Sequence, residues 1–521
     1  MGLDSLVALL GYASQRLYLI LFVIATYFAV GRARQYWRLR HFKGPRTAGF
    51  LWWWHAKACL SGQAHQHYGD ANEKYGPITR IAPNHLITSS PDLWAKINGA
   101  RSLYQKAPWY YHSARFEPGK DNIFTECDSD HHDDRRKKMA AGYSGKQNPT
   151  LEPSIDGHVK ELVGLVRKYA TPAASTGPLR PMDLSKKIPF FTLDVISHVG
   201  LGKPFGDLKA DADVFDYLKS TEEGLRIGNT SLALGLNWLR ELPVIGPAIS
   251  PSEKDVSGFG KMMAEARKLV NERMTQSMDT KSDMLASFLR NGVSGEDLFQ
   301  EAFEQILAGS DTTAASIRVI LLYIISHPRV YARLQAEIDA AVESGKAPAS
   351  PEVISDAAAR ELPYLGAVIR EAMRVYPPVA NLFSRIVPDG GDVVTVDGKE
   401  YFLPGGTMVG YSAWGMHRNN KLVYGEDAKV FRPERWLIDA STPEQEEQLA
   451  RMIKTNDMIF GHGRWACLGK VIALLEIHKS IFELFRHFDL ALTNPHQPWR
   501  LFNTLGLLEI QDMWVHVTTR P

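Results

Sequence analysis

The sequence predicts a mainly helical protein with a small β region, preceded by one transmembrane helix at the amino terminus. Long amphipathic stretches dominate the 521 residues, whereas strand-like alternation is confined to short pieces punctuated by Gly and Pro. Beyond the amino-terminal segment there is no low-complexity linker, internal repeat or abrupt change of composition. This uniformity indicates one large domain over residues 49–521.

Charge and cysteine content restrict the classes of function. The 60 Lys and Arg residues nearly balance the 58 Asp and Glu residues, so net charge gives no reason to expect nucleic acid as a partner. The three cysteines, Cys59, Cys127 and Cys467, are far apart and form no CxxC pair. That spacing argues against a zinc ribbon or a disulfide framework. Any metal chemistry must therefore use a single cysteine.

The predicted membrane anchor, residues 1–31, is built around an apolar run from Leu17 to Val30. As a helix this run is about 21 Å long, which is shorter than the roughly 27 Å core of an endoplasmic-reticulum bilayer. Residues back to Leu6 must therefore contribute to the span, and Arg16 must reach toward the headgroups.

Basic residues follow the apolar run instead of preceding it, which favours an anchor over the alternative, a cleaved signal peptide. By the positive-inside rule they stay on the cytoplasmic side. We therefore expect an endoplasmic-reticulum protein, in contact with membrane lipid, whose remaining chain lies in the cytosol with reduced cysteines. The basic residues occupy a hinge over residues 32–48 and include Arg32, Arg34, Arg38, Arg40 and Lys43.

Periodicity places the main elements of the large domain. The clearest helical pattern runs from Glu296 to Ser326 and ends at His327-Pro328. Other helical patterns cover residues 155–169 and 259–274, and strand-like alternation covers residues 78–88, 393–402 and 507–517.

Cys467 is the leading candidate metal ligand. It lies in the segment Phe460-Gly461-His462-Gly463-Arg464-Trp465-Ala466-Cys467-Leu468-Gly469, directly before a strong helical pattern. The amides and dipole of a helix start stabilise a thiolate. The glycines permit a tight turn whose amides point at the sulfur, and they leave room for a flat macrocycle. A lone cysteine is otherwise more often a small core residue.

Three further segments precede the cysteine segment in the chain. Ala308-Gly309-Ser310-Asp311-Thr312-Thr313 lies inside the long helix, and Glu371-Ala372-Met373-Arg374 places opposite charges three residues apart on one helix face. Phe431-Arg432-Pro433-Glu434-Arg435-Trp436 follows. Taken singly, an ExxR pair is common on surfaces and contributes less than about 1 kcal/mol.

These four segments, in this order, resemble the cytochrome P450 family, whose haem-binding signature FxxGxRxCxG is specific. The resemblance covers essentially the whole chain after the anchor and implies the cytochrome P450 fold for a catalytic domain over residues 49–521. The sequences of residues 131–136 and of the cysteine loop resemble those of fungal microsomal enzymes of the pisatin-demethylase-like subgroup.

The resemblance implies a set of haem contacts for haem b (iron protoporphyrin IX). Cys467 would be the axial thiolate of the iron, and Phe460 would pack beside it. His132 and Arg136, one helical turn apart, and Arg385 would bind the haem propionates, which need cationic or hydrogen-bonding partners when buried. For each of these three residues the alternative is a solvated surface position.

Trp465 stands where the family usually has an Arg or His that contacts a propionate. Its indole N–H could replace that contact, or another group could neutralise the carboxylate. The Arg464 side chain, one place earlier, could point toward a propionate or away from it.

The resemblance also implies a structural triad of Glu371, Arg374 and Arg435 that locks the core behind the haem. Asp311 and Thr312 would form the proton relay for oxygen activation, because they supply an acid and a hydroxyl. The alternative is a Thr hydroxyl bonded back to a helical carbonyl and a solvated Asp. Gly309 costs about 1 kcal/mol in mid-helix relative to alanine, so we expect it to have a use, such as a groove for dioxygen.

The expected function is a haem-thiolate monooxygenase that hydroxylates or oxidatively demethylates an apolar small molecule, in secondary-metabolite biosynthesis. The resemblance implies electrons from NADPH-cytochrome P450 reductase, with cytochrome b5 as a further candidate partner. A basic surface for the reductase would include Arg135, Lys137, Lys138 and Lys470. Expected pocket walls are residues 109–124, the helix around Phe303 and Leu307, residues 379–383 and residues 502–505.

Two other functions stay open. A P450-fold enzyme can rearrange or couple substrates without oxygen insertion, although the Asp311-Thr312 pair favours conventional oxygen activation. A non-enzymatic haem-binding protein would consume no NADPH, and none of the motifs favours it.

Overall fold

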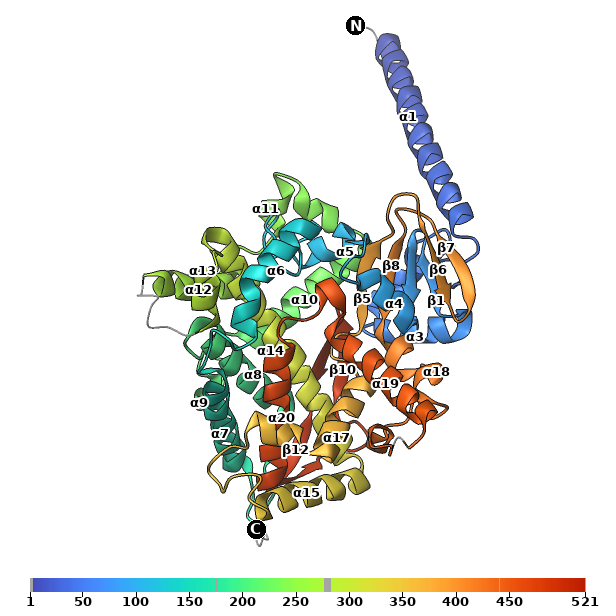
Figure 1. The fold of residues 1–521 in the computed structure, drawn as a ribbon. Helices are drawn as coiled ribbons and strands as arrows, with labels where there is room; N and C mark the ends of the chain where they lie inside the picture. Colours follow the sequence, from blue (N-terminus) through green and yellow to red (C-terminus); the bar gives the residue numbers. More distant parts are fainter. Residues whose placement is uncertain (1–2, 174–176, 276–282, 440, 521) are drawn as a thin grey trace.

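The computed structural model describes residues 3–173, 177–275, 283–439 and 441–520. It is mostly helical with several small sheets, so the predicted fold class is confirmed at this level. Figure 1 shows a globular body from which the amino-terminal helix projects.

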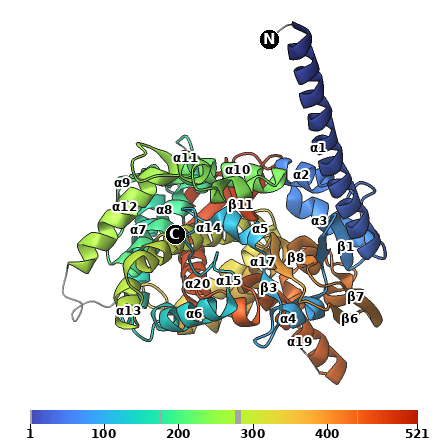
Figure 2. The same cartoon turned by 90° about the horizontal axis from the view of Figure 1, so that it is seen from above.

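Helix α1 (Leu3–Arg38) carries the predicted anchor. Its part from Gln15 to Arg38 is exposed and has a mean hydropathy of 1.5, and its length and composition would allow it to cross a membrane. The helix does not end with the apolar run but continues through the first basic residues, and both views show its outer, amino-terminal part projecting from the body (Figures 1 and 2). The only other described helix that passes the same test, α14 (Gly295–Ile325), is mostly buried.

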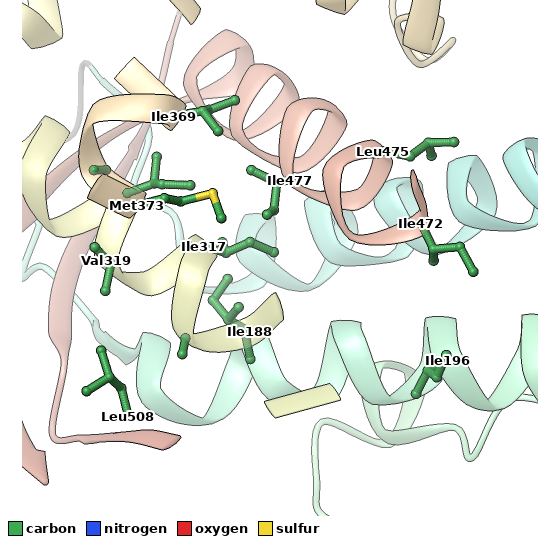
Figure 3. Close-up of a cluster of buried hydrophobic side chains, with 14 of the residues drawn as sticks. Ile188, Ile196, Ile317, Val319, Ile369, Met373, Ile472, Leu475, Ile477 and Leu508 are labelled. Atoms are coloured by element: carbon green, nitrogen blue, oxygen red, sulfur yellow. The ribbon is translucent and has the colours of Figure 1, made fainter. Parts of the chain in front are cut away.

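Helix α14 is the centre of the core. It packs along α8 (Leu184–Leu201) and also contacts α17 (Pro363–Val375) and α20 (Lys470–His487). Aliphatic side chains from all four helices meet in Figure 3, where Ile188 of α8, Ile317 of α14, Met373 of α17 and Ile477 of α20 point toward one another. These residues are almost fully buried.

The remaining helices surround this core, and the two other helical predictions correspond to α7 and α12. Their bounds are α2 Trp53–Leu60, α3 Ala64–Tyr75, α4 Pro91–Asn98, α5 Pro108–Tyr111, α6 Ser129–Tyr143, α7 Leu151–Tyr169, α9 Asp207–Ala210, α10 Tyr217–Leu234, α11 Ile245–Ile249, α12 Gly258–Met274, α13 Met284–Arg290, α15 Pro328–Glu343, α16 Asp356–Arg360, α18 Lys421–Tyr424 and α19 Pro443–Asp457.

The largest sheet has the strand order β1-β2-β8-β5-β3, with bounds Ile78–Ala82, His85–Thr88, Met408–Ser412, Asn381–Ile386 and Gln105–Lys106. The register of β5 against β8 shifts between Leu382 and Arg385, where Leu382 and Phe383 have positive φ. This irregularity bends the strand, and it lies where β5 reaches the interior cavity described below.

The strand region predicted at 78–88 lies in the largest sheet, and the regions predicted at 393–402 and 507–517 lie in the smaller sheets, which also contain strands that were not predicted. The hairpin of β6 (Asp392–Val396) and β7 (Lys399–Leu403) and the hairpin of β10 (Arg500–Thr504) and β11 (Leu507–Gln511) are each two-stranded. A three-stranded sheet has the order β4-β12-β9, with bounds Pro181–Asp183, Trp514–Thr519 and Phe488–Leu492.

Candidate functional site

An interior cavity of about 340 Å³ lies between α14, α6, β5 and the cysteine segment. Its walls are mostly aliphatic and aromatic, and Cys467 and Thr312 both line it. Two residues that the sequence analysis singled out on separate grounds, 155 positions apart, therefore face the same space.

The cysteine segment forms a tight turn between helices α19 and α20. The amide of Cys467 donates to the Phe460 carbonyl at 2.7 Å, which closes the loop. Gly463 has a φ of 57°, and a Cβ there would lie 2.1 Å from the Asn98 carbonyl oxygen of α4. Only glycine fits this approach, because any larger residue would displace a backbone oxygen.

The surroundings of the Cys467 sulfur partly favour a thiolate. Burial raises the pKa of this thiol, but the Gly469 and Lys470 amides and the Arg136 and Lys470 charges act in the opposite direction. The side chain has a large accessible surface because it faces the cavity, although protein surrounds it. Helix α20 begins at Lys470, as the expected helix start requires.

Helix α14 presents Gly309 and Thr312 to the cavity. The Thr312 hydroxyl donates to the Ala308 carbonyl at 2.9 Å, so it bonds back to its own helix in this state. A Cβ on Gly309 would lie 2.7 Å from the Ile196 side chain of α8. The close packing of α8 accounts for a glycine at this position, and its expected role in a groove for dioxygen stays a prediction.

Asp311 is not among the residues that line the cavity; its carboxyl group interacts with the Tyr217 side chain of α10 and with the Glu509 charge of β11. Burial raises its pKa to about 7, which the charge of Arg318 counteracts and the charge of Glu509 reinforces. Its Oδ2 atom is buried and has no hydrogen-bond partner within the described ranges. The acid can therefore exchange a proton near neutral pH, one residue away from the cavity-facing hydroxyl.

The three predicted propionate-binding residues, His132, Arg136 and Arg385, all line the cavity. Arg136 donates to the Ala466 carbonyl at 2.6 Å. The Arg385 guanidinium lies 4.2 Å from the centroid of the Trp465 ring, and its buried Nε has no partner in the part of the chain that is described. Burial, with the charge of Lys106, lowers the pKa of His132 to about 3, so its imidazole is neutral.

The two residues at the unusual position turn in different directions. Trp465 lines the cavity under Arg385. The Arg464 side chain turns toward α6, where its Nε lies 3.1 Å from an Asp133 carboxylate oxygen. The Arg464 side chain therefore contacts α6 outside the cavity, whereas the Trp465 ring lies on the cavity side of the loop.

Several polar residues of the cavity were not predicted from the sequence, among them Lys106, Glu304, Gln305 and Glu476. The Lys106 ammonium donates to the Ile123 and Phe124 carbonyls at 2.9 Å, and burial together with the Arg385 charge lowers its pKa to about 7. Its strand, β3, has only two residues and gave no periodic signal. Glu304 lies eight residues before Thr312, a spacing that helical periodicity could have revealed.

These side chains fit a haem. The Cys467 sulfur faces the cavity beside Gly469, where an added Cβ would lie in van der Waals contact with that sulfur, 3.8 Å away. Around the same cavity lie Arg136, Lys106 and Arg385, and the buried Nε of Arg385 lacks a partner among the described residues. A thiolate donor combined with buried cations is what an iron macrocycle with two carboxylates needs.

Comparison with known proteins agrees with this site. The family model for cytochrome P450 matches residues 43–514. The chain belongs to the cytochrome P450 family. It is therefore an oxidoreductase, and the family implies a haem-iron cofactor.

Fungal relatives match over nearly the whole chain. Cytochrome P450 monooxygenase ABA1 of Pyricularia oryzae is 36% identical over 511 residues, which are 96% of each chain. The aba1 enzyme of Botryotinia fuckeliana is 36% identical over 92% of each chain. The abl1 enzyme of Leptosphaeria maculans is 33% identical over 91% of this chain and 82% of its own. Membership of the pisatin-demethylase-like subgroup stays a prediction.

Behind the cavity of this P450, Glu371, Arg374 and Arg435 form the expected cluster and are fully or almost fully buried. Glu371 accepts two hydrogen bonds from Arg374 and one from Arg435, each 2.8 Å long. It also accepts from the Trp436 indole and the Arg432 amide at 2.9 Å. Burial alone would raise the pKa of Glu371, but the two arginines hold it below its usual value.

The pocket walls of this P450 were predicted in part. Leu307, Val379, Phe383 and Leu505 line the cavity, as do several aromatic residues between positions 110 and 124. Phe303 does not: it packs in the core, with its ring 4.5 Å from that of Phe116.

The predicted basic surface also needs one correction. Arg135 is largely buried, and its guanidinium lies 2.9 Å from the buried Glu301 carboxylate, so it is committed to an internal ion pair. Lys138 and Lys470 are partly exposed and have acidic neighbours, whereas Lys137 is exposed.

Proposed function

We propose that this P450 inserts one oxygen atom from O2 into an apolar small molecule of secondary metabolism, by hydroxylation or oxidative demethylation. NADPH-cytochrome P450 reductase would supply the electrons. The observation that carries the proposal is the joint presence of Cys467 and Thr312 on one apolar cavity, with the acid Asp311 next to the hydroxyl.

Bound through Cys467, haem b would activate O2 with the thiolate donating electron density to assist O–O cleavage. The chain's own residues would then manage protons. The Thr312 hydroxyl, now bonded to Ala308, would turn to the cavity to donate its proton. Asp311 would restore that proton from the side of α10 and β11. The apolar walls would exclude water and hold the substrate.

The membrane assignment is supported by the exposed apolar surface. We propose residues 1–31 as an anchor in the endoplasmic-reticulum membrane, residues 32–48 as the basic hinge and residues 49–521 as the cytosolic catalytic domain. Near α11, which lies at the same end of the body as the outer part of α1 in Figure 1, Trp238, Val244 and Ile249 are exposed. Carbonate extraction of microsomes should leave the full chain in the pellet and release a chain lacking residues 1–31 more readily.

The decisive experiment has two parts. The reduced protein with CO should give the spectrum of a thiolate-ligated haem, and Cys467→Ser should abolish it. Turnover under 18O2 with NADPH and reductase should place one labelled oxygen in the organic product. Absence of label from every product would favour the rearrangement or coupling alternative, and absence of NADPH consumption would favour a non-enzymatic haem protein.

A further inference from the structure

Glu304 and Glu476 are the two carboxyl groups among the described residues that line a mostly apolar cavity, and Glu304 is the one on α14, the helix that carries Thr312. Residues 304, 308 and 312 are spaced by four on α14, so they share one helix face. All three line the cavity. Eight residues of helix span about 12 Å, which sets the backbone distance between Glu304 and Thr312.

The Glu304 side chain is held in place from one side. Its Oε2 accepts a hydrogen bond from the Asn122 amide at 3.2 Å. Asn122 is itself fixed, because it is fully buried and its Oδ1 accepts from the Phe124 and Thr125 amides at 2.9 Å. No other hydrogen bond to Glu304 is found in the described part of the chain, so Oε1 is left to the cavity.

Electrostatics favour the neutral carboxylic acid. Burial raises the pKa of Glu304 to about 8, the neighbouring Glu301 adds to this, and Lys106 opposes it. Because Oε2 already accepts from Asn122, the proton belongs on Oε1, which makes the free oxygen a hydrogen-bond donor. A buried donor without an acceptor is unfavourable. The nearby cation Lys106 also disfavours a cationic ligand.

We propose that Glu304 determines substrate specificity by donating a hydrogen bond to an oxygen atom of the substrate. The substrate class is then an apolar skeleton that already carries a carbonyl, hydroxyl or carboxylate oxygen. Binding of that oxygen near Glu304 orients the skeleton along α14. A carbon atom far from the bound oxygen then lies near Thr312. This inference rests on the proposed function, since it assumes that the cavity holds both haem and substrate.

The test uses probes that bind a haem iron whatever the natural substrate is. N-alkylimidazoles with chains of four to twelve carbons are titrated into the haem-loaded full-length protein, each paired with the same chain ending in a hydroxyl group. Dissociation constants come from the Soret shift. We expect the hydroxylated probe to bind more tightly than its partner, with the largest difference in affinity at one chain length. At that length, Glu304→Leu should lower the ratio of the two affinities about tenfold, which corresponds to about 1.4 kcal/mol.

Two further variants separate the alternatives. Glu304→Gln keeps an acceptor for Asn122 and a donor for the probe, so it should retain most of the ratio. Asp297→Asn, which changes an exposed acid on the same helix outside the cavity, should leave the ratio unchanged. An unchanged ratio in Glu304→Leu at every chain length, or an equal loss in Asp297→Asn, would overturn the proposal.

Failure of the proposed function would be visible separately. The reduced-CO spectrum is recorded on the same samples, and a wild-type spectrum without the thiolate band would contradict the haem-thiolate site itself. A normal band combined with equal probe ratios would contradict only the role of Glu304.

Discussion

Replacing Glu371 by Gln should destabilise the haem-loaded protein more than most single substitutions. The change keeps the shape but removes the charge that compensates Arg374 and Arg435, and it turns an N–H group toward one of their donors. Because these side chains are buried, the expected cost is that of breaking a buried ion pair, about 3–5 kcal/mol. With about 2 cal/mol/K of unfolding entropy per residue, 1 kcal/mol corresponds to about 1 °C for a domain of this size.

The assay is the midpoint temperature at which the reduced-CO band is lost, with haem content measured beforehand. We expect a fall of about 3–5 °C in Glu371→Gln. The matched control is Glu361→Gln, which removes a carboxylate from an exposed ion pair with Lys346 and should shift the midpoint by less than about 1 °C. Full haem content and a midpoint within 1 °C of the wild type would refute the reasoning.

The pH dependence of this contribution has a definite sign. The two arginines depress the pKa of Glu371 in the folded state. Its stabilisation is therefore complete above the unfolded-state pKa, near 4.5, and is lost as pH falls through the lower folded value. The Glu371→Gln protein should lose less stability than the wild type on acidification below that point.

Three more outcomes follow from the cavity. Gly309→Ala should lower the same midpoint by up to about 2 °C, because overpacking against Ile196 outweighs the better helix propensity; a rise would show that α8 yields easily. Asp311→Asn should keep the CO spectrum but lower the turnover coupled to NADPH consumption at least about tenfold. In the wild type, the fraction of NADPH that yields product should decline above pH 7 as Asp311 ionises, and the variant should show no such decline. Arg385→Leu should weaken haem retention, measured by transfer to apomyoglobin, whereas an unchanged transfer rate would remove Arg385 from the propionate site.

Local signals account for what the sequence predicted well. The turn around Cys467, the start of α20 and the long helix α14 depend on glycines, helix ends and periodicity within a few residues of each other. Glu371, Arg374 and Arg435 came only from the family resemblance, because an ExxR pair looks the same on a surface and in a core.

The residues that were missed or misplaced depend on packing between distant segments. Arg135 seemed a solvated cation because nothing nearby in the sequence reveals the buried Glu301, 166 positions later, that pairs with it. Phe303 and Leu307 lie one turn apart, yet only the position of α12 and Phe116 decides which of them faces the core. Lys106 became part of the cavity because a two-residue strand pairs with the bent strand β5.

The end of α1 is fastened to the body at several points. Arg80 donates to the Gln35 carbonyl at 3.0 Å, Arg38 donates to the Gly405 carbonyl at 2.7 Å, and the rings of Tyr36 and Phe50 stack 4.1 Å apart. These contacts restrict how far the end of α1 can turn relative to the body. With residues 1–31 in a bilayer, as proposed, the tilt of α1 would then set the angle of the catalytic body against the lipid.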